Sequence, residues 1–429
     1  MPVRLFTELF SVIISLFLQL MSTDPRKLSI KDYTYDLPED RIAGYPLEDR
    51  SASSLLVYRA GSITTDIFRQ LPDYLPPGTR MFFNNTRVIH ARLRFREANG
   101  AQIECFCLEP ADGSAAERAF ASTGRVEWLC MVGNQRKWKN EKLNLHFNGA
   151  KGECTLTVQR KERRGRDFVL SFDWNVSAYR FSEVLELVGE LPIPPYLRRD
   201  TEESDKLRYN TVYASESGSV AAPTAGLHFT DEVLSRLKSA GIHKTDITLH
   251  VGAGTFRQVD SDTMSGHDMH SEEFIVSKTA ILGLKESLGK APVIAVGTTS
   301  LRVLESLYWF GLQLACSGAL VRNCIIGQWE PYESGYPNLP VHEALEAVIN
   351  WMNARSLENL SGHTRLMVAP GYHFRIIDGL VTNFHQPGST LLLLVAALIG
   401  EDWRKVYRHA LDNGFRFLSY GDSSLLLRS

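Results

Sequence analysis

The sequence lacks the features that mark a disulfide-stabilised, metal-binding or strongly charged protein. Its six cysteines include no C-x-x-C pair, which argues against a zinc site and a disulfide framework and suits a reducing cytoplasm. Acidic and basic residues nearly cancel, and the formal net charge is -2. Such a chain has no overall attraction for nucleic acid, so any RNA binding must depend on local basic patches. No internal repeat or low-complexity tract is present.

The sequence also lacks a convincing membrane span, which needs ~20 apolar residues. STLLLLVAALIG (residues 389–400) is apolar but short, and it predicts a buried core helix. Residues 1–20 resemble the hydrophobic region of a signal peptide without a small-x-small cleavage motif. We expect Met21 to be the working start and residues 1–20 to be an extra segment outside the fold. A true signal peptide is the alternative.

With 429 residues, of which 44% are hydrophobic, the chain is long enough for two or three domains with full-sized cores. From residue 80 to residue 174, apolar and polar side chains alternate in the manner of half-buried strands. The apolar positions of the five runs are Ile103/Cys105/Cys107, Val126/Trp128/Cys130/Val132, Leu143/Leu145/Phe147, Cys154/Leu156/Val158 and Phe168/Leu170/Phe172/Trp174. Five such runs without a convincing helix between them predict a small antiparallel barrel.

After residue 181 the pattern changes to alternating strands and helices. Thr230 is a candidate N-cap for a helix that begins at Asp231 and ends before Gly241. The remaining elements that we expect are strands over residues 245–251 and 293–297 and helices over residues 301–307, 341–353 and 389–400. Strand, turn and helix recurring in this way predict an α/β domain.

Residues 220–230, VAAPTAGLHFT, interrupt these regular patterns. Pro223 and Gly226 break helices and strands, and Thr224 supplies a hydroxyl. His228 is the only side chain here that titrates near neutral pH. The stretch therefore reads either as part of a functional site or as a rigid connection in which His228 caps a backbone group.

Three further clusters could carry chemistry. Residues 298–300 (TTS) lie between a strand and a helix, where hydroxyls and backbone N–H groups favour an anion, although one hydroxyl could simply cap the helix. His270 beside Glu272 is a possible acid–base pair, or else part of a solvated loop. Asn383 and His385 precede the buried helix, as residues of functional loops do, although His385 could be a packed structural residue.

Basic residues gather locally in the region of the expected barrel. The clusters comprise Arg80, Arg87, Arg92, Arg94 and Arg96, together with loops 135–139 (QRKWK) and 159–166 (QRKERRGR). Such loops could follow a phosphate backbone, with Trp138 available for base stacking. They could equally be ordinary solvated surface.

Taken together, these stretches resemble one family. The motifs that carry the resemblance are YDLPEDRIAGYPLEDR (35–50), FFNNTRVIHARL (82–93), LPIPPYL (191–197), RYNTVYASESGSVAAPTAGLHFT (208–230), LHVGAGTF (249–256), MHSEEF (269–274), AVGTTSLRVLE (295–305), PGYHFRIIDGLVTNFHQPGSTLLLLVAAL (370–398) and RFLSYGDSSLL (416–426). In order and wording they are similar to the S-adenosylmethionine:tRNA ribosyltransferase-isomerases of queuosine synthesis. The resemblance covers the chain from about residue 28 to its end.

The resemblance implies a fold, partners and a reaction. An α/β main domain (residues 21–77 and 181–429) is interrupted by a β-barrel domain (residues 78–180). The enzyme would transfer and isomerise the ribosyl moiety of S-adenosylmethionine onto 7-aminomethyl-7-deazaguanine at the wobble position of a tRNA anticodon stem-loop. S-adenosylmethionine is then a co-substrate, and we expect no cofactor, metal or membrane. The expected location is the cytoplasm; a monomer is favoured, although the sequence does not determine the oligomeric state.

The resemblance also implies site residues. His228 is our first choice for the catalytic base, with His270 and Glu272 second. The expected substrate-binding residues are Thr224, Ala225 and Gly226, then Thr298, Thr299, Ser300 and Arg302 for the methionine carboxylate, and Asp378, Asn383, His385, Tyr420 and Asp422 elsewhere in the cavity. Arg87 and Arg92 are the expected tRNA contacts.

Residues 308–365 depart from the family pattern, and MVAPGY (367–372) stands where the family has an aromatic-rich run. Two alternative functions therefore stay open at this point. One is an enzyme that uses S-adenosylmethionine on a different acceptor, and the other is a tRNA-binding module without catalysis.

Overall fold

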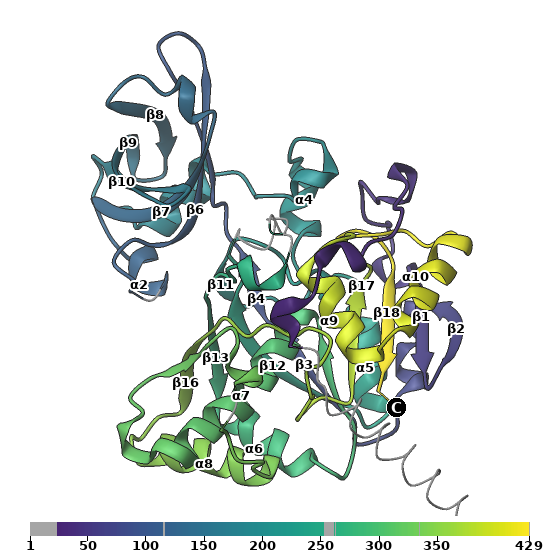
Figure 1. Cartoon of the computed structure of the whole chain (residues 1–429). Helices are drawn as coiled ribbons and strands as arrows, with labels where there is room; N and C mark the ends of the chain where they lie inside the picture. Colours follow the sequence, from purple (N-terminus) through teal and green to yellow (C-terminus); the bar gives the residue numbers. More distant parts are fainter. Residues whose placement is uncertain (1–23, 115, 253–260, 262, 334, 429) are drawn as a thin grey trace, which may run out of the picture.

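The computed structural model describes residues 24–114, 116–252, 261, 263–333 and 335–428 (Figure 1). The expectation for residues 1–20 and most of the glycine turn in LHVGAGTF lie outside these residues. Two lobes are visible, a large α/β body and a smaller β-barrel at the upper left. The α/β fold class that the sequence predicts is confirmed. None of the described helices is long and apolar enough to cross a membrane.

A ten-stranded mixed sheet forms the body, in the order β15-β16-β13-β12-β3-β14-β17-β18-β1-β2. Its strands are β1 (Ser54–Arg59), β2 (Ser62–Ile67), β3 (Arg80–Asn84), β12 (His243–His250), β13 (Glu272–Ser277), β14 (Val293–Val296), β15 (Cys324–Ile326), β16 (Asn359–Thr364), β17 (Gly379–Asn383) and β18 (Ser423–Leu427). A separate two-stranded ladder joins β4 (Thr86–Val88) to β11 (Glu216–Ser219).

Helices cover both faces of this sheet, as the sequence of its central strand requires. All four residues of β14, VIAV, are buried, which is typical of a parallel strand covered on both sides. Ile294 and Val296 belong to one hydrophobic core and Ala295 to the other. Helix α5 (Asp231–Ser239) packs in the first core. The second core is supplied by α6 (Lys278–Ser287), α7 (Thr298–Ser317), α8 (Val341–Asn353), α9 (Thr390–Ile399) and α10 (Asp402–Asp412).

The helices predicted from sequence are present, with one difference in length. Thr230 caps α5 by accepting a hydrogen bond from the Val233 N–H, and α8 has the expected bounds. Helix α7 is longer than predicted because it begins at Thr298 and continues to Ser317. The TTS residues therefore form its first turn instead of a loop before it.

The barrel is a six-stranded antiparallel sheet in the order β5-β6-β7-β10-β9-β8, and β5 also contacts β8. Its strands are β5 (Arg92–Arg96), β6 (Gln102–Pro110), β7 (Arg125–Gly133), β8 (Lys142–Gly149), β9 (Gly152–Arg164) and β10 (Asp167–Trp174). All five alternating runs are strands of this sheet, and Cys105 and Cys107 are buried in its core.

The limits predicted for the barrel, residues 78 and 180, are wrong at both ends. Strand β3 lies in the middle of the ten-stranded sheet, between β12 and β14. Helix α3 (Phe181–Val188) instead buries Phe181, Val184 and Leu185 in the barrel core. The alternation of a strand is the same in either sheet, so the pattern could not assign β3 to its partner strands.

Strands β3, β12, β14 and β17 run in the same direction. Their carboxyl ends therefore meet at one edge of the sheet, which is where ligands bind in open α/β sheets.

Candidate active site

A cavity of about 1160 Å³ opens at this edge of the sheet. It is lined by the segment around η8 (Thr224–Gly226), the start of α7, the residues before α9 and the loop before β13. Residues of the barrel complete the lining. Of the site residues expected from sequence, Thr224, Ala225, His270, Glu272, Thr298, Thr299, Arg302, Asn383 and His385 line the cavity.

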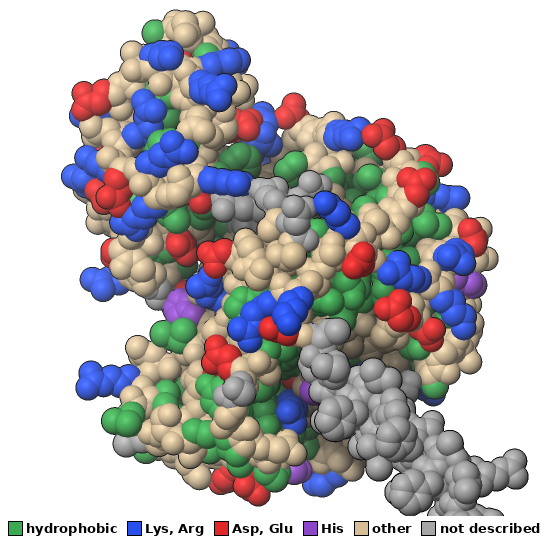
Figure 2. Space-filling view, in the orientation of Figure 1, with side chains coloured by type: hydrophobic (Ala, Val, Ile, Leu, Met, Phe, Trp, Pro, Cys, Tyr) green, Lys and Arg blue, Asp and Glu red, His purple; other side chains and the backbone are tan. Residues whose placement is uncertain are grey.

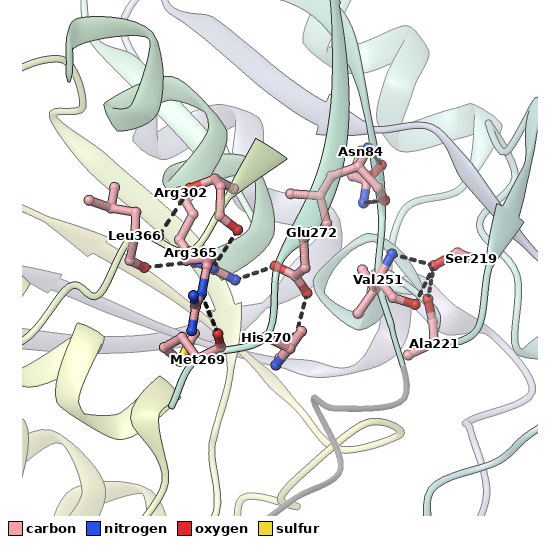
Figure 3. Close-up of polar contacts among 12 residues, drawn as sticks. Asn84, Ser219, Ala221, Val251, Met269, His270, Glu272, Arg302, Arg365 and Leu366 are labelled. Carbon is pink, nitrogen blue, oxygen red and sulfur yellow. Dashed lines mark hydrogen bonds and ion pairs between the residues drawn. The ribbon is translucent and has the colours of Figure 1, made fainter. Parts of the chain in front are cut away.

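The VAAPTAGLHFT segment is shaped to fit this wall. A Cβ atom on Gly226 would lie 1.9 Å from the Tyr213 hydroxyl, so only glycine fits there. Upstream, the Ser219 hydroxyl donates to Ala221 O at 2.7 Å and accepts from Val251 N at 3.0 Å (Figure 3). These two bonds fix the position of the segment relative to the end of β12. Gly226, packed against Tyr213, supports the site from behind the wall.

His270, Glu272 and Arg302 form a connected group on the cavity wall (Figure 3). The Arg302 guanidinium pairs with Glu272 Oε2 and donates through Nε to Leu366 O at 3.1 Å. His270 Nε2 lies 3.0 Å from Glu272 Oε1. An ionised carboxylate only accepts hydrogen bonds, so Nε2 carries the proton and donates it.

The charge of Glu272 is stabilised although the side chain is buried. Burial alone raises the pKa of a carboxyl group, but Arg302 and His270 outweigh that effect and the pKa of Glu272 is lowered. Arg302 is 6% exposed, and all three of its guanidinium nitrogens donate, to Glu272 and to the carbonyls of Leu366 and Thr364. Its geometry therefore does not suit the expected binding of a methionine carboxylate, and it serves to hold Glu272.

The first turn of α7 presents backbone N–H groups to the cavity. Gly297 is the N-cap, with φ of 88°, and no side chain caps the helix. Thr298 and Thr299 line the cavity, whereas the Ser300 hydroxyl points back and donates to Val296 O at 2.8 Å. The alternative that Thr299 or Ser300 caps this helix is therefore wrong. An uncapped helix N-terminus favours an anion.

His228 does not line the cavity. The residue is 4% exposed, and its ring lies between Ser53 Oγ, 2.8 Å from Nδ1, and Asn383 Nδ2, 3.1 Å from Nε2. Burial lowers the pKa of His228 to about 4. His385 is on the wall, but burial lowers its pKa to about 3 and Nε2 is bonded to the Thr382 hydroxyl. The geometry thus favours His270 over His228 as the residue that faces a substrate.

Three further expected residues lie away from the cavity. Asp378 is at the opposite edge of the sheet, where Oδ2 accepts from Val293 N at 2.8 Å. The Tyr420 hydroxyl donates to Asp205 at 2.8 Å. Asp422 accepts from Ser54 N and from Arg416. All three brace loops and strand ends, and their assignment to the cavity wall is wrong.

The two arginines expected to contact tRNA differ in availability. Arg87 on β4 is exposed. Arg92 is paired with Glu104 at 2.6 Å, with its side chain only 14% exposed. Figure 2 shows many Lys and Arg side chains on the barrel lobe, and the two basic stretches, 135–139 and 159–166, are largely exposed. Residues 159–164 are the end of strand β9, so the expectation that they form a loop is wrong. Trp138 is not available for stacking, because it is buried beneath Arg160.

Several wall residues were missed by the sequence analysis. Tyr196 lies in the motif LPIPPYL, and Met367 and Val368 lie in MVAPGY, but nothing in these stretches indicated a position on the cavity wall, and Leu366 lies in none of the named motifs. The departure MVAPGY therefore does fall at the site. Met131, Val132 and Asp167 reach the wall from the barrel, and their strand pattern gave no signal. Arg166 also lines the wall, and it belongs to the basic stretch 159–166 that the sequence analysis had named.

We predict that Glu272→Gln lowers the stability of the α/β domain by about 3 kcal/mol, because it leaves Arg302 buried without its counter-charge. Urea unfolding measures this. The lowered pKa of Glu272 means that its contribution is present at neutral pH and is lost as the pH falls through the folded-state value. The difference between the wild type and the variant should therefore shrink in acid.

The double variant Glu272→Gln/Arg302→Met is the control for this prediction. Because it removes both charges, it should recover part of the loss. A single variant as stable as the wild type would contradict the prediction.

The chain matches one family of known proteins over most of its length. Residues 30–426 match the family model described as queuosine biosynthesis protein. A protein of Azoarcus sp. (strain BH72), named S-adenosylmethionine:tRNA ribosyltransferase-isomerase, is 38% identical over 406 residues, covering 94% of this chain and 98% of that protein. A protein of the same name from Ruegeria pomeroyi is 38% identical over 414 residues, covering 93% and 99%.

A solved S-adenosylmethionine tRNA ribosyltransferase from Thermotoga maritima is 26% identical and covers 92% of this chain and 100% of its own, with a TM-score of 0.44. The family assignment rests on the sequence matches, which span more than nine-tenths of the chain. On these matches, the chain belongs to the queuosine biosynthesis protein family, whose matched members are named S-adenosylmethionine:tRNA ribosyltransferase-isomerases.

Proposed function

We propose that this enzyme transfers the ribosyl moiety of S-adenosylmethionine to 7-aminomethyl-7-deazaguanine at the tRNA wobble position and isomerises it. The products are epoxyqueuosine in tRNA, adenine and methionine. One observation carries the proposal: a single cavity combines the His270–Glu272 pair, an uncapped helix N-terminus and residues of the barrel. A proton acceptor, an anion site and a second lobe are what this reaction needs.

The chemistry begins at the sulfonium centre, which acidifies the neighbouring C5′ hydrogens. A base removes one of these protons, and the resulting ylide expels adenine. The amine of the deazaguanine then captures the sugar, and closure of the epoxide releases methionine. A carbanion needs a shielded pocket and a base poised near neutral pH.

His270 is the base in this proposal, in place of His228. Glu272 holds the proton on Nε2, which leaves Nδ1 as the ring nitrogen that can accept a proton. Arg302 keeps Glu272 ionised and in place. The arrangement follows the logic of a base oriented by a buried carboxylate.

The uncapped first turn of α7 binds the methionine carboxylate in this proposal. Thr298, Thr299 and Ser300 supply the free N–H groups, and the partial positive charge of the helix end adds to them. The tRNA lies across Arg87 and the basic stretches 135–139 and 159–166 of the barrel, held through phosphates while the anticodon bases are splayed out.

Incubation with S-adenosylmethionine and tRNA that carries the deazaguanine precursor tests the proposal. Mass spectrometry should detect both adenine and the epoxide nucleoside. Adenine without the epoxide would favour a different acceptor, and no adenine at all would favour a tRNA-binding module without catalysis.

His270→Ala should lower kcat for adenine release by about 10²- to 10⁴-fold, because it removes the proton acceptor. The matched control is His363→Ala, an exposed histidine on β16 of the same sheet, which should leave kcat unchanged. A folded His270→Ala enzyme with near-normal kcat would refute the assignment.

Arg87→Ala should weaken tRNA binding and make the plot of log affinity against log salt less steep by about 0.7, as expected for one lost phosphate contact to single-stranded RNA. Filter binding over a salt series measures the slope. Lys290→Ala is the control, because exposed Lys290 precedes β14 at the opposite edge of the sheet. Equal slopes for wild type and Arg87→Ala would remove Arg87 from the RNA-binding surface.

A further inference from the structure

Asn383, the last residue of β17, has an unusual hydrogen-bonding pattern on the cavity wall. Its amide nitrogen donates twice, to His228 Nε2 at 3.1 Å and to Leu418 O at 3.2 Å. Its Oδ1 is buried and has no hydrogen-bond partner among the described residues. Asn383 is only 3% exposed and lines the cavity. A buried acceptor without a partner is costly, and at a cavity it indicates a place for a donor on a ligand.

The neighbours of Asn383 fix the orientation of its amide. Leu418 O can only accept a hydrogen bond, so the amide nitrogen must face it and Oδ1 must face away. Leu418 itself has φ of 68°, an uncommon conformation for a bulky residue. His228 Nε2 accepts from the same nitrogen, so the His228 proton is on Nδ1 and is donated to Ser53 Oγ.

Asn383 lies beside the uncapped start of α7. The Gly297 N–H, at the helix N-cap, donates to Val381 O at 2.8 Å, and Asn383 is two residues further along β17. The α7 N-terminus and Asn383 thus line the same cavity, one with N–H donors and the other with an oxygen acceptor that has no partner among the described residues. An α-amino acid presents the matching pair, a carboxylate next to an ammonium group, and an ammonium group only donates.

We propose that this corner of the cavity binds the amino-acid end of S-adenosylmethionine, with the carboxylate on the α7 N–H groups and the ammonium group on Asn383 Oδ1. His228 and Ser53 are positioning residues that hold the Asn383 amide in this orientation. The inference rests on the proposed function, because it takes S-adenosylmethionine as the ligand.

The environment of His228 fits a positioning role. Its low pKa, near 4, keeps the ring neutral, and only the neutral ring has a nitrogen that can accept from Asn383. The histidine of VAAPTAGLHFT is then needed as a hydrogen-bond acceptor behind the wall. A glutamine at this position would retain an acceptor oxygen, whereas a leucine would not.

The ammonium contact is tested by a double-mutant cycle, in which the Asn383 side chain and the α-amino group of the ligand are removed separately and together. The probes are S-adenosylhomocysteine, which lacks the reactive sulfonium, and its analogue without the α-amino group. Equilibrium dialysis at saturating tRNA gives their affinities. Asn383→Ala should weaken the binding of S-adenosylhomocysteine about tenfold or more and that of the analogue less than about twofold. Equal weakening of both ligands would overturn the proposal while leaving the proposed function standing.

Failure of the proposed function gives a different result. A wild-type enzyme that binds neither probe and releases no adenine from S-adenosylmethionine would refute that function and this inference together.

The His228 variants test the positioning role by the same measurement. His228→Gln should bind S-adenosylhomocysteine within about threefold of the wild type, because Asn383 keeps its acceptor, whereas His228→Leu should lose affinity as Asn383→Ala does. A folded His228→Leu protein that weakens both ligands equally, or a His228→Gln variant no better than it, would refute the role. If His228→Leu does not fold, the comparison of His228→Gln with Asn383→Ala decides.

Discussion

The buried ion pair between Glu272 and Arg302 is the constraint on which the site depends. Two charges removed from water are tolerated only when they are paired and their remaining hydrogen bonds are satisfied. Glu272 meets this requirement with Arg302 and His270, and Arg302 with the carbonyls of Leu366 and Thr364. The need to satisfy both charges therefore fixes β13, α7 and the chain after β16 against one another. These same segments form one part of the cavity wall.

Much of the fold could be predicted because it follows from local periodicity. Five of the six barrel strands, together with α5 and α8, are each encoded within a short stretch, so the sequence predicts them well. The place of β3 could not be predicted, since RMFFN gives the same pattern in either sheet. Only its pairing with β12 and β14, which lie more than 150 residues away, assigns it to the larger sheet.

The candidate site, like the fold, could be predicted only in part. The family motifs identified the correct stretches of the sequence. They did not show whether a given side chain points into the cavity or lies behind its wall. His228 and His270 both stand in such stretches, and sequence could not show that His270 reaches the cavity while His228 supports Asn383 from behind. Asp422 and Tyr420 were misplaced for the same reason, because a polar residue that braces a loop resembles one that binds a ligand. The part of the cavity wall that barrel residues supply depends on how the two lobes pack together, and no local sequence pattern encodes that packing.

The buried histidines show how this distinction works physically. A ring that is enclosed by the protein loses its charged form, as the lowered pKa values of His228 and His385 indicate. Such a ring is a stable, neutral donor and acceptor, suited to fixing another group in place, and poorly suited to taking up a proton during catalysis. His270 is half-buried on the cavity wall, and its Nε2 is hydrogen-bonded to the ionised Glu272 carboxylate. Burial therefore separates the histidines by position: His228 is enclosed and hydrogen-bonds to Asn383 from behind the wall, whereas His270 lies at the cavity surface beside Glu272.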